Sequence, residues 1–340
     1  MQQAHANDAN HVQARLSQLE KQLQKALQTP SINGMNPLAQ RFNITALLEL
    51  ETFIEDNQAQ DNQSDTTLAT IEVAIHSKIN PYIEGQVLLL HEDGNEQDIA
   101  LDEGYLSLSA PQSSVQLKAG KQVIAFGNFE SHCISDPLTL ELAETKNTAI
   151  TLQSQTNDYY ALLYVFNGDS AIQDNNDEIK QSGIQLGLLG NLKHQQWHLG
   201  AGYISSLGES TSFKDYFSEQ ADDYQLQDNT PAASVHGSFS MPHWHLLAEY
   251  VTATQSFHQD DFAFSGSGAQ PSVYHVEIAH DFIMLNRALT LSFAQQGSQQ
   301  ALALELPKRR YLMALSHEVY KHTSISLEYM HAQDYSLEQG

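Results

Sequence analysis

Apolar and polar side chains alternate with a period of two along most of the chain after residue 41. Between Phe42 and Leu50, apolar residues occupy every second position, and the intervening positions are mainly polar. The same alternation recurs over residues 69–79 and again over residues 324–329. A two-residue period is typical of β-strands that have one apolar face. The pattern therefore predicts an all-β protein.

The connections between the predicted strands alternate between tight and long. The tight ones are at Asn80-Pro81, Pro111 to Ser114, Asn157-Asp158, Lys193 to Gln196, Pro242-His243, Asn286-Arg287 and His322. The long ones are Asp56 to Asp65, Glu92 to Asp98, Gly127 to Asn147, Gly168 to Ser182, Gly208 to Pro231, Ser256 to Ser272 and Gln295 to Arg310. Short turns at one end and long loops at the other are typical of outer-membrane barrels, whose strands run about 9–11 residues. A soluble β-sandwich has no reason to sort its connections in this way.

Aromatic residues mark both ends of two predicted strands. Trp197 and Trp244 follow tight turns, and Tyr203 and Tyr250 lie further along on the same faces, with apolar residues between. Rings at both edges of an apolar band predict the aromatic girdle of a membrane-spanning strand. Packing in a soluble core is the alternative for each ring taken alone.

The pattern gives about fifteen strands over residues 41–340, whereas single-chain bacterial barrels close with an even number. The chain also stops at Asp334 to Gly340, inside what should be an external loop. We therefore expect an antiparallel transmembrane β-barrel of about sixteen strands, with one closing strand missing from this chain. A miscounted strand is the alternative.

A different period governs the N-terminus. Apolar residues from Val12 to Leu27 recur at intervals of three and four, which predicts a helix. We expect residues 1–30 to form a short periplasmic coiled-coil segment and residues 31–40, with Gly34 and Pro37, to form a linker. An amphipathic helix packed on its own domain is the alternative. Ala4-His5-Ala6 resembles the end of a signal-peptide cleavage site or is a chance match.

Composition narrows the function classes. The formal net charge is -25, with 41 acidic against 16 basic residues, which disfavours nucleic-acid binding. No apolar run is long enough for a transmembrane helix. Cys133 is the single cysteine, and the 16 histidines show no metal-ligand spacing. No Gly-x-Ser-x-Gly or His-Glu-x-x-His motif occurs, so neither an enzyme, a cofactor nor a bound metal is expected.

The third long connection is too apolar for a fully hydrated loop and too irregular for a simple strand. We expect it to fold into the barrel as a pore-narrowing loop, with apolar residues on the wall and carboxylates facing the channel. An ordinary packed surface loop is the alternative. Its candidate constriction residues are Phe126, Gly127, Asn128, Phe129, Glu130, Asp136, Glu141 and Glu144.

Acidic residues also occupy the polar face of several predicted strands. The lumen-facing candidates are Glu49, Glu72, Glu249, Glu277, Glu318 and Glu328. Carboxylates would favour cations, whereas a local ladder of basic residues would favour anions. The candidates for such a ladder are Lys78, Lys118, Arg309, Arg310 and Lys321. The sign of the selectivity stays open.

The runs GNFES (127–131) and ISDPLTLELAET (134–145), with VLLLHED (87–93) before them and YVFNGD (164–169) after them, resemble the LbtU-type siderophore porins. The similarity extends from about Phe42 to the C-terminus and is densest between Leu88 and Asp169. It implies a Gram-negative outer-membrane barrel with a coiled N-terminal segment, associated with uptake of a ferric siderophore without an energised plug. His132-Cys133 departs from the expected Asn and Met, and the missing closing strand puts pore formation by this chain in doubt.

The first hypothesis is thus an outer-membrane porin for a ferric siderophore or another small solute. It would contact outer-membrane lipid, form a homo-oligomer with a trimer favoured, and bind no nucleic acid. A nonspecific porin for small cations or sugars is the alternative within transport. A non-conducting structural envelope barrel is the alternative from a different class.

Overall fold

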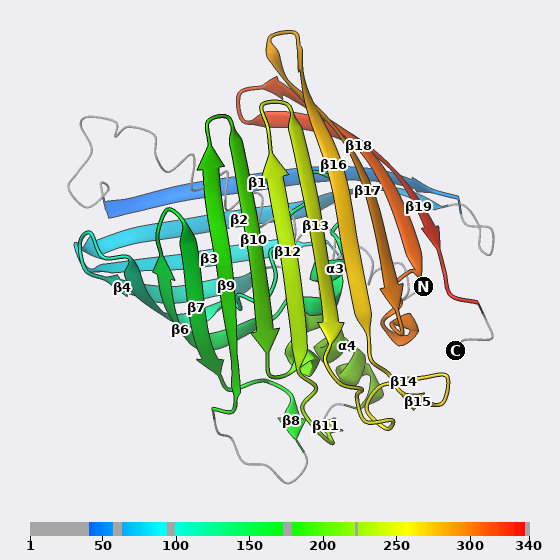
Figure 1. Ribbon diagram of the computed structural model, residues 1–340. Helices are drawn as coiled ribbons and strands as arrows, with labels where there is room; N and C mark the ends of the chain where they lie inside the picture. Colours follow the sequence, from blue (N-terminus) through cyan, green and yellow to red (C-terminus); the bar gives the residue numbers. More distant parts are fainter. Residues whose placement is uncertain (1–40, 57–62, 94–98, 173–178, 222–223, 337–340) are drawn as a thin grey trace.

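The computed structural model describes residues 41–56, 63–93, 99–172, 179–221 and 224–336. Fifteen strands form one antiparallel sheet in which each strand pairs with its neighbours along the chain (Figure 1). They are β1 (Phe42–Glu55), β2 (Gln63–Asn80), β3 (Ile83–Glu92), β4 (Ala100–Ser109), β5 (Val115–Val123), β6 (Lys146–Gln155), β7 (Tyr159–Phe166), β9 (Gln181–Leu192), β10 (Gln195–Ile204), β12 (Ala232–Ser240), β13 (Trp244–Ala253), β16 (Ser272–Met284), β17 (Arg287–Gln299), β18 (Arg309–Tyr320) and β19 (Thr323–Gln333). The prediction of an all-β antiparallel sheet of about fifteen strands is confirmed.

The sheet curves strongly but stays open in the part of the chain that is described, because β1 and β19 do not pair with each other. Closure by a sixteenth strand therefore remains a prediction. The expected coiled-coil segment (1–30) and linker (31–40) lie outside the described residues. No helix in the described ranges is long and apolar enough to cross a membrane.

The seven tight connections join strands at one end of the sheet, and the long ones gather at the other end. In the turn between β16 and β17, Leu285 and Asn286 both have positive φ, 53° and 63°. Two such residues form a type I′ turn, whose twist matches that of the flanking strands. The long connections carry the remaining elements, α3 (Leu138–Ala143), α4 (Thr211–Gln220), η2 (Leu207–Glu209), η3 (Leu302–Leu304), β8 (Ala171–Ile172), β11 (Gln225–Leu226), β14 (Ala263–Phe264) and β15 (Ser267–Gly268).

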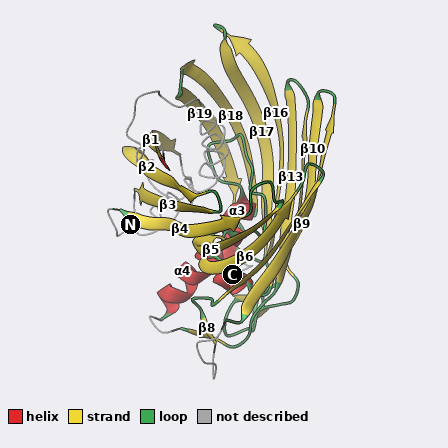
Figure 2. Cartoon of the chain, turned by 90° about the vertical axis from the view of Figure 1, so that its left-hand side faces the viewer, coloured by secondary structure: helices red, strands yellow, loops and turns green. Residues whose placement is uncertain are grey.

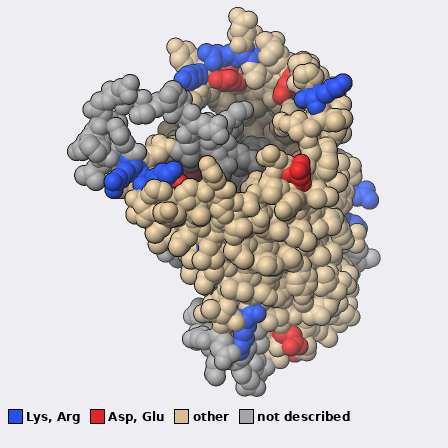
Figure 3. Space-filling view, turned by 60° about the vertical axis from the view of Figure 1, so that its left-hand side comes forward, with Lys and Arg blue, Asp and Glu red and all other residues tan. Residues whose placement is uncertain are grey.

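The outer, convex face of the sheet is apolar and exposed. Leu199, Val276 and Phe293 are 55%, 52% and 46% exposed, although each stands in the middle of a strand. Figure 3 shows a broad wall without charged side chains, with Lys, Arg, Asp and Glu gathered around the upper rim and at the lower end. A continuous apolar surface of this kind needs an apolar environment. The alternation along each strand supplies that face.

The four residues of the expected aromatic girdle all stand on this outer face. Trp244, Tyr203 and Tyr250 are exposed and Trp197 is half-buried. The tryptophans lie near the tight-turn end of β10 and β13, and the tyrosines lie towards the long-loop end. Their placement in a membrane interface remains a prediction.

The inner, concave face carries an aromatic core at the long-loop end. Phe213 of α4 stacks on Phe257 with 4.7 Å between ring centroids, and Phe262 meets Phe213 edge-on at 4.9 Å. Leu138 and Leu142 of α3 are fully buried in the same cluster. Figure 2 shows α3 within the curve of the sheet and α4 at its lower end. The long loops therefore fold inward and pack on one another. Neither helix was expected from the sequence.

The outer face yields a direct prediction. Leu199→Lys places a charge in the middle of β10 on the apolar face and should destabilise the bilayer-folded state by about 2–4 kcal/mol. Ser238→Lys, on the inner face of the neighbouring β12, is the matched control and should cost less. Urea titration of folding into phospholipid vesicles measures both. Equal costs would show that the two faces do not differ in environment.

Candidate functional site

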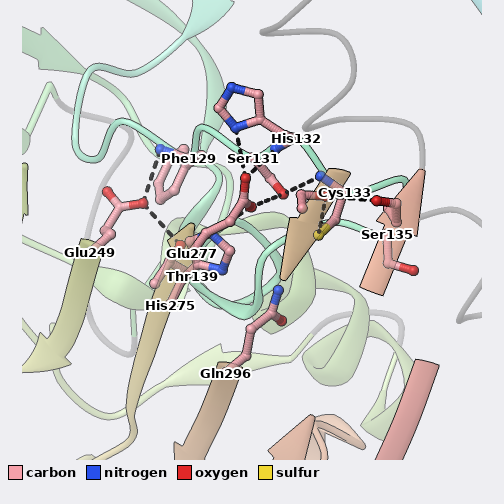
Figure 4. A network of polar contacts seen from close by, with 12 residues as sticks. Phe129, Ser131, His132, Cys133, Ser135, Thr139, Glu249, His275, Glu277 and Gln296 are labelled. Carbon is pink, nitrogen blue, oxygen red and sulfur yellow. Dashed lines mark hydrogen bonds and ion pairs between the residues drawn. The ribbon is translucent and has the colours of Figure 1, made fainter. Parts of the chain in front are cut away.

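Loop 3, defined here as residues 124–145 between β5 and β6, crosses the concave face to strands far away in the sequence. Its residues bond to side chains of β13, β16, β17, β18 and β19. Figure 4 shows the centre of this network, in which the loop backbone faces a row of side chains on the wall. A loop that touches so many strands is positioned by the fold as a whole.

Glu249 of β13 holds the first part of loop 3. Its carboxylate accepts hydrogen bonds from the N–H groups of Asn128 (2.7 Å) and Phe129 (2.9 Å) and from the hydroxyl of Thr139 (2.9 Å). Phe129 adopts a φ of 51°, a left-handed conformation that is uncommon for a residue with a side chain. The two N–H bonds to one carboxylate fix the loop in this turn.

Glu277 of β16 holds the middle of the loop. It accepts hydrogen bonds from the Ser131 hydroxyl at 2.7 Å and the His132 N–H at 2.8 Å, and His132 Nδ1 lies 2.7 Å from it. His275 Nε2 on the same strand lies 3.3 Å from the other carboxylate oxygen. Figure 4 shows Glu277 enclosed by these partners. Both carboxylate oxygens are therefore engaged although the side chain is fully buried.

Glu328 of β19 holds the next residues, accepting hydrogen bonds from the N–H groups of Ile134 (2.6 Å) and Ser135 (3.1 Å) and from the Ser135 hydroxyl. Arg310 of β18 then donates to the carbonyl oxygen of Asp136 (3.0 Å) and forms an ion pair with Glu141. Three glutamates and one arginine thus grip successive segments of loop 3.

The energetic reason for this arrangement is the cost of burying charge. A buried carboxylate is stable only when several donors replace the water it loses. Backbone N–H groups in an irregular loop have the matching need for acceptors. Each hydrogen bond to a charged group contributes about 1.5–3 kcal/mol. The clamps, meaning Glu249, Glu277 and Glu328, satisfy both needs at once.

The strand register places all six predicted lumen-facing glutamates on the face opposite to the apolar one. Three of them are the clamps, and their acidity is used to hold loop 3 rather than to line open space. Glu72 is buried, Glu49 is half-buried, and Glu318 lies 3.4 Å from Arg287. The sequence predicted the face on which these residues stand, but not that three of them accept hydrogen bonds from loop 3.

Two glycines permit the close approach of loop 3 to the wall. A Cβ on Gly202 of β10 would lie 2.3 Å from the carbonyl oxygen of Phe126, which accepts a hydrogen bond from Ser234. A Cβ on Gly127 would lie 2.8 Å from Oε1 of Glu249. Any larger side chain at either position would push the loop from the wall.

The predicted constriction residues divide into buried and partly exposed groups. Phe126 and Phe129 are buried, as expected of wall anchors. Asp136 and Glu144, expected to face the channel, are instead buried at 1% and 5% exposure. Their main chains lie at the two ends of the segment that carries α3, which packs inward. Asn128 and Glu130 are the residues of the loop tip that border a small cavity on the concave side.

Sequence reasoning missed a histidine-rich strip beside the loop tip. The Tyr160 hydroxyl lies 2.8 Å from His198 Nε2 and 3.1 Å from His236 Nε2, which joins β7, β10 and β12. His245 Nε2 lies 2.9 Å from Asp281. In the sequence, these residues could be recognised only by their places at the polar, inward-facing positions of the strands. No group of three or more His, Cys, Asp or Glu side chains within the described ranges could hold a metal ion.

No family model matches the chain. It is 27% identical over 313 residues to a UPF0422 protein of Legionella pneumophila (strain Philadelphia 1), covering 85% of this chain and 58% of that protein. It is 25% identical over 334 residues to a UPF0422 protein of Coxiella burnetii, covering 95% of this chain and 70% of that protein. The chain thus spans little more than half the length of the Legionella relative.

Solved structures with a similar fold are outer-membrane porins. The outer-membrane channel DcaP of Acinetobacter baumannii aligns with a TM-score of 0.56 and 10% identity, over 88% of this chain and 93% of that one. An anion-selective porin from Comamonas acidovorans aligns at 0.58 and 9%, over 87% and 90%. Salmonella typhi OmpF aligns at 0.57 and 9%, over 88% and 92%. The fold of the chain is therefore that of a porin wall.

Cys133 provides a built-in probe of how firmly the clamps hold loop 3. The thiol is buried, and burial together with the nearby Glu277 raises its pKa. Glu249→Ala removes three hydrogen bonds to the loop without removing a charge that acts on Cys133. We expect maleimide to label Cys133 at least tenfold faster in this variant, because each lost bond is worth about 1.5–3 kcal/mol.

Glu318→Ala is the control, since Glu318 lies on the same face of the sheet but contacts Arg287 instead of the loop. Its labelling rate should equal that of the unchanged protein. A slow rate in both variants would show that Glu249 does not hold the loop in place.

Proposed function

We propose that the protein is an outer-membrane diffusion channel whose bore is narrowed by loop 3. The observation that carries the proposal is the clamped loop, which crosses the polar, concave face of a sheet whose other face is apolar. A soluble β-protein would bury the apolar face and leave the polar face to water. Here the arrangement is reversed, which suits a wall between lipid and an aqueous path.

The clamps change what the acidic composition means for selectivity. Glu249, Glu277 and Glu328 are engaged by loop 3, so they face its backbone rather than a solute in the open part of the bore. Lys118 stands on the same face over the Tyr105 ring, 3.6 Å from its centroid. A solute in the bore therefore contacts fewer carboxylates than the composition suggests. The acidic composition by itself does not exclude a polycarboxylate ligand.

A ferric siderophore is the proposed solute, on the basis of the sequence resemblance described above. A channel for small cations or sugars is the alternative solute class, and a non-conducting envelope barrel is the alternative function. The proposal also includes a location in the outer membrane, a trimeric assembly and the absence of catalysis. The activity of the whole protein belongs to the proposal as well, since the chain spans 58% of the Legionella relative.

Planar-bilayer recording of the protein tests the channel. We expect discrete conductance steps that fall by about half or more in Glu130→Trp, because a bulky ring on loop 3 would obstruct the constriction that the proposal places there. Leu246→Trp on the outer face is the control and should leave the step unchanged. Failure of the protein to conduct would support the envelope-barrel alternative, and an equal step in both variants would place loop 3 outside the path.

The solute class is tested by block of the same channel. Micromolar ferric siderophore should reduce the current reversibly, whereas the iron-free siderophore at equal concentration should reduce it less. A channel that conducts but ignores both forms would favour the nonspecific porin. Interruption by sugars alone would point to a different solute.

A further inference from the structure

A second group of buried acids lies at the C-terminal end of loop 3, away from the clamps. Five carboxylates come together from β2, β3, β4 and the loop, and each is at most 7% exposed. They are Glu72, Glu92, Asp102, Glu103 and Glu144. Lys146 of β6 is the basic residue among them, with its Nζ 2.6 Å from Asp102. The root cluster, meaning these five acids and Lys146, has far more acid than base.

Hydrogen bonds compensate only part of this charge. Glu103 accepts from the Gln86 amide at 3.2 Å and from the Val123 N–H at 3.1 Å. In contrast, one carboxylate oxygen of Glu72, one of Asp102 and one of Glu144 are buried without a hydrogen-bond partner. A buried charge with an unsatisfied oxygen is among the costliest arrangements in a protein. The excess negative charge must therefore be neutralised.

A bound metal ion is not the means of neutralisation that the geometry favours. In the described ranges no group of three or more acidic, histidine or cysteine side chains is arranged to hold a metal. Lys214 of α4 approaches the cluster through the Lys146 carbonyl oxygen at 3.2 Å, but it forms its ion pair with Asp169. Within the described residues, a proton on one of the carboxylates is the means of neutralisation that remains.

Glu144 is the member of the root cluster that connects it to loop 3. Its N–H donates to the carbonyl oxygen of Leu140 and ends α3, and its own carbonyl oxygen accepts from Thr211, the first residue of α4, at 2.9 Å. Ser212 also donates to the carbonyl oxygen of Glu141. Any repulsion at the Glu144 side chain is thus transmitted to both α3 and α4.

We propose that protonated Glu144 latches α3 and α4 onto the wall, and that its ionisation releases this part of loop 3 and widens the path. The consequence for conduction rests on the proposed channel function, whereas the latch itself does not. The groups that face Glu144 and oppose its ionisation are Glu92 of β3 and Asp102 and Glu103 of β4. Lys146 is the group that favours the charged form of Glu144, whereas Glu72 of β2 interacts with Asp102 and Glu103 of the same cluster.

Burial raises the pKa of Glu144 from 4.5 to about 7; Lys146 opposes this rise and the neighbouring carboxylates add to it. Below pH 4.5 the latched and released forms are both protonated, so pH does not shift their balance. Between pH 4.5 and about 7 the released form ionises first, so the latch weakens steadily as pH rises. Above about pH 7 both forms are ionised and no further weakening occurs.

Hydrogen–deuterium exchange of the full chain in detergent micelles tests the latch without relying on conduction. The readout is the protection of backbone amides in residues 138–145, compared with Glu144→Gln at each pH so that intrinsic exchange chemistry cancels. The two proteins should nearly match at pH 4, below the pKa of both forms, and the unchanged protein should exchange on the order of tenfold or more faster at pH 8. A ratio that does not change with pH would overturn the proposal.

Two further measurements keep the result unambiguous. Glu92→Gln removes one carboxylate that repels Glu144 and should shift the transition to lower pH; an unshifted midpoint would exclude the root cluster as its cause. Restored protection at pH 8 on addition of millimolar Ca²⁺ would show that a cation, not a proton, neutralises the site. Exchange that responds to pH while bilayer current is absent would leave the latch standing and reject the channel.

Discussion

The architecture depends on hydrogen bonding between loop 3 and three glutamates of the far wall. Glu249, Glu277 and Glu328 each accept two or more hydrogen bonds from the loop, which turns irregular backbone into a fixed part of the interior. Neither partner is stable alone in a buried setting, because the carboxylates need donors and the loop N–H groups need acceptors. Because each partner needs the other, loop 3 lies across the concave face with its backbone against the wall.

The two ends of loop 3 are held by opposite electrostatics. At the clamps, several hydrogen-bond donors of the loop converge on each carboxylate. At the root cluster, five acids face one lysine and the match fails. The clamps hold the first part of loop 3 with fully used carboxylates. The C-terminal end of the loop instead carries Glu144, whose pKa lies near neutrality. The proposed pH response of loop 3 follows from this difference between its two ends.

The sequence predicted the sheet well, because a two-residue period is a local property that each strand carries by itself. The alternation around Leu199 and Leu246 predicted which side chains face outward. Turn residues such as Asn286 predicted where the tight connections lie. The helices were not predicted, because their formation depends on contacts with residues far away in the sequence. α3 has only six residues, and its Leu138 and Leu142 are explained by packing against distant loops, not by a helical repeat.

By itself the sequence determined the strands, their order, the sorting of loops by length and the face on which each glutamate stands. Only the tertiary structure decided which of those glutamates would bind the loop, because Glu328 meets Ser135 across almost two hundred residues. It likewise decided that Asp136 and Glu144 are buried, since their environment comes from strands that local pattern cannot see. Periodicity fixes which way a side chain points; the curvature of the whole sheet fixes what it meets.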